Sequence, residues 1–473
     1  MTIHISATTG CNLGCTYCYE NPDRERKQEW VDRQYDMDKI IEQLDKHKEK
    51  YPNEAPGLHG GEPLLLKNED IRTLFSEMES RWPDQSYHIQ SNGTLIDDEI
   101  IDIFEDYSVG VGISCDGPPE LNSERKAAGE RDKDAGDSTN NMSQTTNKSI
   151  RRIAESDVYC GVITVLHKTN AGTDEKFETL LDWIDELNQL GVYGHFNPAI
   201  PYEDVQEDIS LSPNTLADRY IRTWEWMKEE SYRMWNPMRN MVDNLLGLTL
   251  TNCVNTECDV FNAGAAKIIK GDGGTTGCGK TWSTVGDGVP FLQGIENESE
   301  YDKEDARYRS LKQTPGKYTD DEPDMGGCKG CKYWQVCKGG CPSSGKNDDY
   351  RNRTIWCDPK YKLYQRIEND LRSLLPNIKL ITDYEWDMEI SEGVSRQNLD
   401  IKPFGAMRNP TSGPSSSFQE HARSPDTDHI AKSFDMIRKD AEKKYDESVL
   451  TINEEEETIH ADSGMVEWDE VDK

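Results

Sequence analysis

The chain has 473 residues and carries 89 Asp and Glu against 54 Lys and Arg, which gives a formal charge of −35 and a pI near 4.6. A surface this acidic repels nucleic acid and anionic membranes, so neither is expected as a partner. No apolar run reaches the 18 residues of a membrane-spanning helix, and the N-terminus lacks the regions of a secretory signal. We therefore expect a cytoplasmic protein, and acidity spread along the whole chain is typical of adaptation to high intracellular salt.

The first 200 residues alternate short strand-like segments with amphipathic helical ones. The pattern predicts strands at 3–6, just before His59, and at 87–90, 109–114, 158–166 and 192–196, with helices at 37–48, 68–81, 97–106, 148–155 and 174–190. About six β–α units predict an α/β fold with a parallel sheet, whose ligands bind at the carboxyl ends of the strands. The polar stretch 122–147 contains almost nothing that can form a core, so it is predicted to be a flexible surface insertion.

Three cysteines follow the first strand directly. Cys11, Cys15 and Cys18 are spaced C-x3-C-x2-C, and Tyr17 precedes the last of them. Three cysteines on a [4Fe–4S] cluster leave one iron open for a substrate or cofactor. A zinc knuckle is the alternative, but zinc usually takes four ligands, and His4, a candidate for the fourth, falls in the strand rather than in the loop.

Other predicted strand ends carry short polar or glycine-rich motifs. They are Gly60-Gly61-Glu62-Pro63, Ser91-Asn92-Gly93-Thr94, Ser114-Cys115-Asp116-Gly117-Pro118 with Arg125 shortly after, and His195-Phe196-Asn197-Pro198. Paired glycines let the backbone approach a ligand, and a carboxylate accepts from an ammonium group. Each motif alone is more often a plain turn, so their common position is what indicates a site. Cys115 and Cys160 fall within strand-like segments and are predicted to be buried structural thiols.

The second half has a helical stretch at 212–248, then eight cysteines, then a helix at 360–375. The cysteines are Cys253, Cys258, Cys278, Cys328, Cys331, Cys337, Cys341 and Cys357. Eight ligands suffice for two four-coordinate centres, either iron–sulfur clusters or zinc ribbons. Beyond 375 the helical period is lost, apart from a possible helix at 430–446. We predict a first domain at 1–211, a helical bridge at 212–252, a cysteine-rich domain at 253–375 and an acidic, partly disordered tail at 376–473.

The three-cysteine loop and the motifs after it resemble the radical SAM superfamily, and the second cysteine set resembles the SPASM extension of that superfamily. The resemblance implies a partial (β/α)6 TIM-like barrel in which the open iron binds S-adenosylmethionine. One electron then cleaves this cofactor to methionine and a 5′-deoxyadenosyl radical.

Cofactor contacts are implied by the same resemblance. The implied residues are Tyr17, Gly60, Gly61, Glu62, Pro63, Ser91, Asn92, Ser114 and Arg125. Arg125 is assigned to the cofactor carboxylate, and a solvated loop arginine is an equal alternative. Asp116 either faces the substrate or caps a turn.

Two auxiliary [4Fe–4S] clusters, three clusters in all, are also implied. The first auxiliary cluster takes Cys253, Cys258, Cys278 and Cys341, and the second takes Cys328, Cys331, Cys337 and Cys357.

Enzymes of this branch modify peptides and proteins, so we expect a peptide or protein substrate and a low-potential electron donor such as ferredoxin or flavodoxin. We favour a maturase of ribosomally made peptides that forms a cross-link or another oxidative modification. The first alternative is a formylglycine-generating sulfatase maturase, but Gly279 stands where that branch carries an aspartate after the cysteine. A tetrapyrrole side-chain enzyme is a second alternative, and a non-catalytic iron–sulfur electron carrier is a third.

Overall fold

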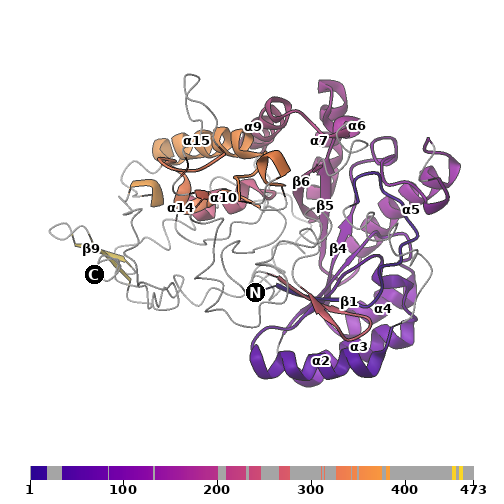
Figure 1. Ribbon diagram of the computed structural model, residues 1–473. Coiled ribbons are helices and arrows are strands. Elements are labelled where there is room, and N and C mark those ends of the chain that lie inside the picture. Colours follow the sequence, from indigo (N-terminus) through magenta and orange to yellow (C-terminus); the bar gives the residue numbers. More distant parts are fainter. Residues whose placement is uncertain are drawn as a thin grey trace.

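The computed structural model describes residues 2–18, 35–83, 85–130, 134–200, 209–230, 234–246, 266–276, 310–311, 314, 326–341, 344–348, 351–374, 380–383, 450–453 and 458–461. Its centre is a curved sheet with helices on its outer side and a helical group beside one edge (Figure 1). Six of the eight strands of the sheet come from the first 198 residues and two from residues 266–276, and the helical group joins residues 209–246 to residues 326–383.

The sheet contains eight strands in the order β6-β5-β4-β3-β2-β1-β7-β8. Their bounds are β1 Thr2–Ser6, β2 Gly57–Leu58, β3 Tyr87–Ser91, β4 Val109–Ser114, β5 Cys160–Leu166, β6 Tyr193–Pro198, β7 Ala266–Lys270 and β8 Thr275–Thr276. Strands β1 to β6 are parallel and lie in sequence order, while β8 pairs antiparallel with its neighbour β7. The predicted parallel sheet of six β–α units is therefore confirmed.

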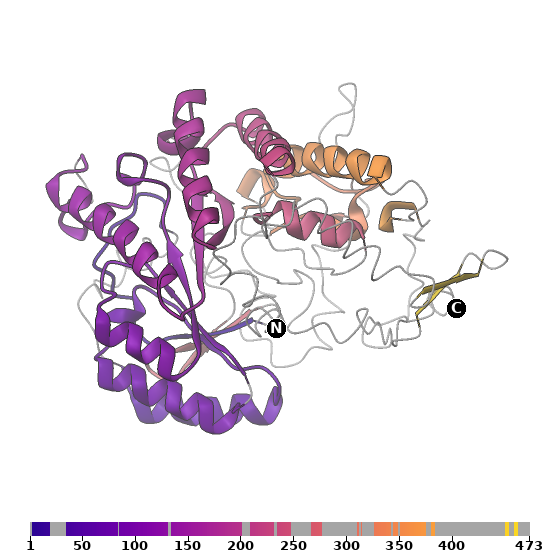
Figure 2. The ribbon, with the colours of Figure 1, turned by 180° about the vertical axis from the view of Figure 1, so that it is seen from behind.

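Helices α2 Met37–Lys50, α3 Asn68–Arg81, α4 Asp98–Asp106, α5 Asp137–Ala154, α6 Lys168–Ala171 and α7 Asp174–Gln189 connect these strands. Seen from behind, they cover the outer face of the sheet (Figure 2). The burial pattern explains this arrangement, because Tyr87, Ile89, Val109, Val111 and Ile113 alternate with less buried residues along β3 and β4. The apolar set packs under the helices, and the alternate side chains point to the other face, which the helices leave free.

Strand β7 comes from a segment that the sequence analysis placed in the cysteine-rich domain. It pairs in parallel with the whole of β1, from Thr2 opposite Ala266 to Ser6 opposite Lys270. Strand β7 therefore covers the edge of β1 that β2 leaves unpaired, although β7 lies beyond residue 253. The three-cysteine loop follows β1 directly in the chain. Pairing removes an exposed strand edge beside the site.

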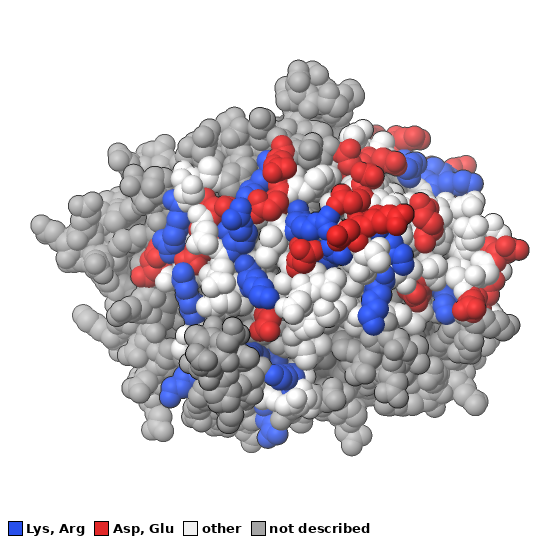
Figure 3. Space-filling model, turned by 90° about the horizontal axis from the view of Figure 1, so that it is seen from above, with Lys and Arg blue, Asp and Glu red and all other residues white. Residues whose placement is uncertain are grey.

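The helical group contains α9 Pro213–Glu230, α10 Met238–Leu245, α14 Trp334–Cys337 and α15 Cys357–Leu374. Trp224, Met227, Trp235, Met238 and Met241 are all buried and form the apolar core of this group, and Trp226 packs against it partly buried. Ion pairs join α9 to its neighbours on the outside. The pairs include Arg219–Asp174 at 2.7 Å and Lys228–Asp370 at 2.6 Å. On the face seen from above, basic and acidic side chains lie next to one another (Figure 3).

The remaining elements are short. The 3-10 helices are η1 Pro63–Leu65, η2 Pro119–Leu121, η3 Ala128–Glu130, η5 Lys346–Asp348 and η6 Ile381–Asp383, and the strands β9 Leu450–Asn453 and β10 Thr458–Ala461 form an antiparallel pair. The helix predicted at 430–446 lies outside the described residues. None of the helices in the described ranges is long and apolar enough to cross a membrane.

Candidate active site

The three-cysteine loop leaves the carboxyl end of β1 and is held from three sides. On the first side, the Gly61 and Glu62 amides donate to the Thr8 and Gly10 carbonyls at 3.0 and 2.8 Å. This approach requires glycine, because a β-carbon built on Gly61 would lie 2.1 Å from the Gly10 oxygen. The predicted role of the paired glycines as a close-approach segment therefore has a physical basis, although the backbone that they approach is the cysteine loop.

Asn92, at the end of β3, holds the loop on the second side. Its side-chain amide donates to Asn12 Oδ1 at 2.8 Å and lies 3.7 Å from the sulfur of Cys11. The Leu13 amide lies 3.4 Å from the same sulfur. N–H donors aimed at a cysteine sulfur stabilise its thiolate and tune a bound iron centre.

The third side is formed by residues 124–128, which run antiparallel to the loop. The Gly14 and Thr16 amides donate to the Lys126 and Glu124 carbonyls at 2.8 and 2.9 Å, and Leu13 and Ala127 form an isolated bridge. We call residues 124–128 the clamp strand.

The prediction that 122–147 is a flexible insertion is wrong for its described residues. Besides the clamp strand, they contain η3 and the first two-thirds of α5. Helix α5 buries a polar face, in which Thr139, Ser143, Thr146 and Asn147 are 1 to 7% exposed. Each of these side chains makes a hydrogen bond to another segment of the chain. The Thr139 hydroxyl accepts from the Ala127 amide at 2.9 Å, and the Thr146 hydroxyl donates to the Asn92 carbonyl at 2.9 Å. A polar helix face can be buried when its groups are paired, and composition alone does not reveal this.

Glu62 of the glycine segment is fully buried and ties two strand ends together. Its carboxylate accepts from the Ser91 hydroxyl at 2.8 Å, the Asn92 amide at 2.7 Å and the Leu64 amide at 3.0 Å. Burial raises the pKa of Glu62 above its ordinary value, although these hydrogen bonds oppose the shift. In this structure Glu62 positions Ser91 and Asn92, and the cofactor contact expected of the Gly60–Pro63 segment stays a prediction.

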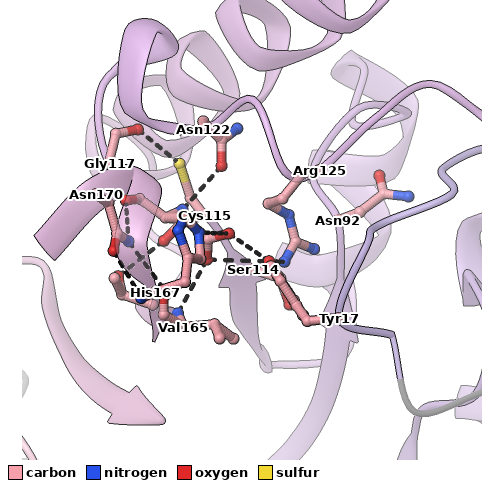
Figure 4. Close-up of polar contacts among 12 residues, drawn as sticks. Tyr17, Asn92, Ser114, Cys115, Gly117, Asn122, Arg125, Val165, His167 and Asn170 are labelled. Carbon is pink, nitrogen blue, oxygen red and sulfur yellow. Dashed lines mark hydrogen bonds and ion pairs between the residues drawn. The ribbon is translucent and has the colours of Figure 1, made fainter. Parts of the chain in front are cut away.

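Asp116, at the end of β4, is the centre of a buried polar network. One carboxylate oxygen accepts from the Tyr17 hydroxyl and lies 3.3 Å from Nε2 of His167, and the other accepts from the Val165 amide at 2.9 Å. Arg125 lies 4.0 Å from the carboxylate and donates to the Tyr17 hydroxyl at 2.7 Å. Figure 4 shows Tyr17, Arg125 and His167 meeting at this point from three separate segments of the chain. Asp116 therefore fixes the tyrosine of the cysteine loop.

The network balances its charges internally. Burial alone raises the pKa of Asp116, but the hydrogen bond from His167 and the Arg125 charge outweigh it and hold that pKa below its ordinary value. Arg125 is 8% exposed, which excludes the solvated-loop alternative. Its Nε is buried, and none of the described residues accepts a hydrogen bond from it. A donor left unsatisfied beside the cysteine loop suits an anionic ligand group.

Sequence reasoning missed His167 and Asn170. His167 stacks on Tyr17 with ring centroids 5.7 Å apart, and Asn170 donates to the carbonyls of Asp116 and Val165 at 2.9 and 2.8 Å. Both are fully buried. The available signal was their position directly after β5, because the other motifs also lie at the ends of strands. Ser114 accepts from Gln90 at 2.8 Å at the same edge of the sheet.

The donor set of the loop fits a [4Fe–4S] cluster. Cys11, Cys15 and Cys18 are all free thiols. Burial raises the pKa of Cys15 to about 12, the Arg125 charge opposes this, and Cys18 and Cys11 add to it. The described residues contain no three His, Cys, Asp or Glu side chains arranged for a single metal ion. A cubane takes these three cysteines and leaves one iron open, whereas zinc usually takes four ligands.

A second group of cysteines lies about a cavity in the helical group. Its lining includes Cys328, Cys331, Cys337 and Cys357, together with Tyr333, Trp334, Gly339, Thr354, Lys360, Tyr361 and Tyr364. These four cysteines are the set that the sequence analysis assigned to one auxiliary cluster. Burial raises the pKa of Cys357 to about 12, Arg353 opposes this, and Cys337 and Cys331 contribute to it, so their sulfurs lie close enough to interact.

Other predicted residues are only partly described. Cys341 is a buried free thiol, but Cys253, Cys258 and Cys278, and also Gly279, lie outside the described residues. Cys115 and Cys160 are buried at 0 and 4% exposure, as predicted, and burial raises the pKa of each to about 12. His195 and Asn197 lie on β6, on the side away from buried Phe196.

Comparison with known proteins gives a family match for the first part of the chain and a shared fold. The profile of the Radical SAM superfamily matches residues 5–203. An uncharacterized protein of Synechocystis sp. is 33% identical over 196 residues, and this chain spans 43% of its length. The cysteine-type anaerobic sulfatase-maturating enzyme of Clostridium perfringens (strain 13 / Type A) is 22% identical over 398 residues, which are 79% of this chain and 97% of that enzyme.

The solved structure of native anSMEcpe with bound AdoMet and Cp18Cys peptide has the same fold. It superimposes with a TM-score of 0.56 at 17% identity and covers 80% of this chain and 99% of that one. The profile match begins in β1 and ends just after β6, so it includes the cysteine loop, the Gly60–Pro63 segment and the Asp116 network. Residues 5–203 are therefore similar to the Radical SAM superfamily, and the fold of the chain is that of the matched structure.

Proposed function

We propose that the protein is a radical SAM enzyme that modifies a peptide or protein, and that its C-terminal half holds two auxiliary [4Fe–4S] clusters. The observation that carries the proposal is the cavity lined by Cys328, Cys331, Cys337 and Cys357 on the same chain as a radical SAM domain. The similarity to the sulfatase-maturating enzyme supports it, because that similarity continues well beyond the domain and covers 79% of the chain.

A [4Fe–4S] cluster bound by the cysteine loop would supply the electron for reductive cleavage of S-adenosylmethionine, the chemistry that initiates hydrogen abstraction from a substrate. The chain's own residues position this chemistry. Cys11, Cys15 and Cys18 hold the cluster, and Arg125 offers its unsatisfied Nε to the methionine carboxylate. Tyr17, which Asp116 fixes, directly precedes the third cysteine of the loop. Burial of this network excludes water, which would otherwise compete for its donors.

Two substrate classes are the main candidates. A maturase of ribosomally made peptides is favoured by Gly279, since the formylglycine branch carries an aspartate at that position. A sulfatase maturase is favoured by the similarity across almost the whole length of the Clostridium enzyme. In both classes the substrate radical gives up an electron, and the auxiliary clusters would accept it. A ferredoxin- or flavodoxin-type donor would supply the first electron.

The first test is 5′-deoxyadenosine formation by the anaerobically reconstituted chain with dithionite and S-adenosylmethionine. We expect product from the wild type and none from Cys15→Ala. Adding a cysteine-containing sulfatase peptide then separates the classes: formylglycine in that peptide would assign the sulfatase branch, and stimulation only by a precursor peptide would assign the other. A chain loaded with clusters that yields no product with any peptide would favour the electron carrier or the tetrapyrrole enzyme.

A separate test concerns the auxiliary clusters. Iron and sulfide content are measured in a Cys11→Ala/Cys15→Ala/Cys18→Ala variant, with and without an added Cys331→Ala. We expect cluster iron to remain in the first variant and to fall in the second. Iron absent from the first variant would remove the auxiliary clusters from the proposal.

A further inference from the structure

Lys360 is a buried lysine in the first turns of α15, and its side chain lines the cavity of the four cysteines. It is 5% exposed. Two other buried cations have partners. Arg219 forms an ion pair with Asp174 at 2.7 Å, and Arg353 donates to the Gly327 carbonyl at 2.9 Å. Within the described part of the chain, no carboxylate or hydrogen-bond acceptor pairs with the Lys360 ammonium.

The side chain of Lys360 has lost most of its contact with water. Such a position is unfavourable for an ammonium group unless a nearby negative charge offsets the lost hydration. The described surroundings of Lys360 provide aromatic side chains, Tyr361 and Tyr364, and thiols. The thiols are the one source of negative charge in this lining, since they ionise when they bind a metal.

The ammonium group of Lys360 lies near residues of both cysteine sets. A β-carbon built on Gly340 would lie 3.4 Å from Lys360 Nζ, so the ammonium lies beside Gly340. Gly340 directly precedes Cys341, which the sequence analysis assigned to the other auxiliary cluster. Lys360 therefore reaches from the cavity toward the neighbouring cysteine.

We propose that Lys360 is the counter-charge of the cluster held by Cys328, Cys331, Cys337 and Cys357, and that it raises the reduction potential of that cluster. The inference rests on the proposed auxiliary clusters. A cubane with four thiolate ligands is anionic and gains a further negative charge on reduction, so a buried cation stabilises the reduced form more. A cluster that accepts an electron from a substrate radical needs such stabilisation.

The experiment compares Lys360→Met, Lys360→Gln and Lys360→Arg in the full-length reconstituted chain. The readout is a redox titration followed by electron paramagnetic resonance, in which the relevant signal is identified as the one lost in Cys331→Ala. Lys362→Met is the matched control, because Lys362 is exposed two residues further along the same helix and its charge is screened by water. Iron content is measured for every variant.

The expected result is a lower potential in Lys360→Met and Lys360→Gln, a potential near the wild-type value in Lys360→Arg, and no shift in Lys362→Met. Loss of this cluster from both neutral variants, with retention in Lys360→Arg, supports the same role. An unchanged potential in a fully loaded neutral variant, or equal effects of arginine and methionine, would overturn it. A wild type without the Cys331-dependent signal would instead contradict the proposed function.

Discussion

Asp116 shows how one residue sets the geometry of the cysteine loop. It is fully buried and gathers Tyr17, Arg125 and His167 from segments 9 to 99 residues away in the sequence. A carboxylate at this point accepts from Tyr17, faces Nε2 of His167 and pairs with the Arg125 charge, whereas a neutral amide of the same shape has one oxygen and adds a donor. Its charge is therefore what holds the tyrosine against the loop.

Replacing Asp116 with Asn is expected to lower 5′-deoxyadenosine formation about 10²-fold, as a small misplacement of positioned groups does. The midpoint of thermal unfolding should fall too, since removing one partner of a buried charge pair costs roughly 3–5 kcal/mol. The rate is measured at matched iron content, with Asp106→Asn, an exposed carboxylate paired with Arg72, as the control. A wild-type rate in Asp116→Asn would show that the network is dispensable.

Stability below neutral pH should depend on the histidines at the base of β1 and β3. Burial lowers the pKa of His88 from 6.5 to about 4 and, together with His59 and His88, lowers that of His4. As the pH falls, the unfolded chain binds these protons first. The free energy that these two neutral histidines contribute to folding is therefore complete above pH 6.5 and is lost as the pH falls toward 4.

Urea unfolding of the wild type and His88→Gln at several pH values tests this effect. The difference between the two free energies of unfolding should change by up to about 2 kcal/mol between pH 7 and pH 5, with the wild type losing more. Parallel curves for the two proteins over this range would contradict the assignment.

At the scale of elements, the clamp strand and α5 act together on the cysteine loop. The clamp strand bonds to the loop, and Thr139 of α5 accepts from the Ala127 amide and donates to Glu130 at 2.6 Å. These bonds connect a helix on the outside of the sheet to the cysteine loop at the carboxyl end of β1.

Thr139→Val keeps the shape of the side chain but removes its hydroxyl. Leaving the buried Ala127 amide unsatisfied costs roughly 1–3 kcal/mol. We expect faster hydrogen exchange in residues 124–130 and faster loss of iron on exposure to a chelator. Thr145→Val, at an exposed position of the same helix, should change neither quantity. If the two variants show equal hydrogen exchange and equal iron loss, α5 does not stabilise the cysteine loop.

For the whole molecule, the formal charge of −35 opposes folding through self-repulsion. Salt screens this repulsion beyond the Debye length, which is about 10 Å at 0.1 M and about 3 Å at 1 M ionic strength. The surface ion pairs that link α7, α9 and α15 lose strength as well, but exposed pairs are each worth only about 0–1 kcal/mol. The long-range term therefore dominates.

Raising potassium chloride from about 0.1 M to about 1 M should accordingly raise the midpoint of thermal unfolding by several degrees. The measurement is a thermal melt followed by circular dichroism, repeated with sodium chloride at the same ionic strength to separate screening from ion-specific effects. A lower midpoint in salt would mean that the paired charges outweigh the unpaired excess.

Periodicity and spacing determined much of this protein from the sequence alone. The alternation in β3 and β4 gave strand bounds within a residue, and the Asn68–Arg81 helix was predicted with the bounds it has. The three-cysteine loop was also identifiable, because its cysteines are close neighbours in the chain. These features are local, and local sequence contains what is needed to find them.

Only the tertiary structure decided the features whose partners are distant. The polar residues of α5 are buried because Asn92, Gly117, Asn122 and Ala127 supply their hydrogen bonds. The pairing of β7 with β1, the meeting of Tyr17 with Asp116, and the gathering of four cysteines and Lys360 about one cavity likewise depend on how the chain is brought together. The physical reason is that a polar or charged group can be buried only where partners meet it, and those partners are set by the fold rather than by the neighbouring sequence.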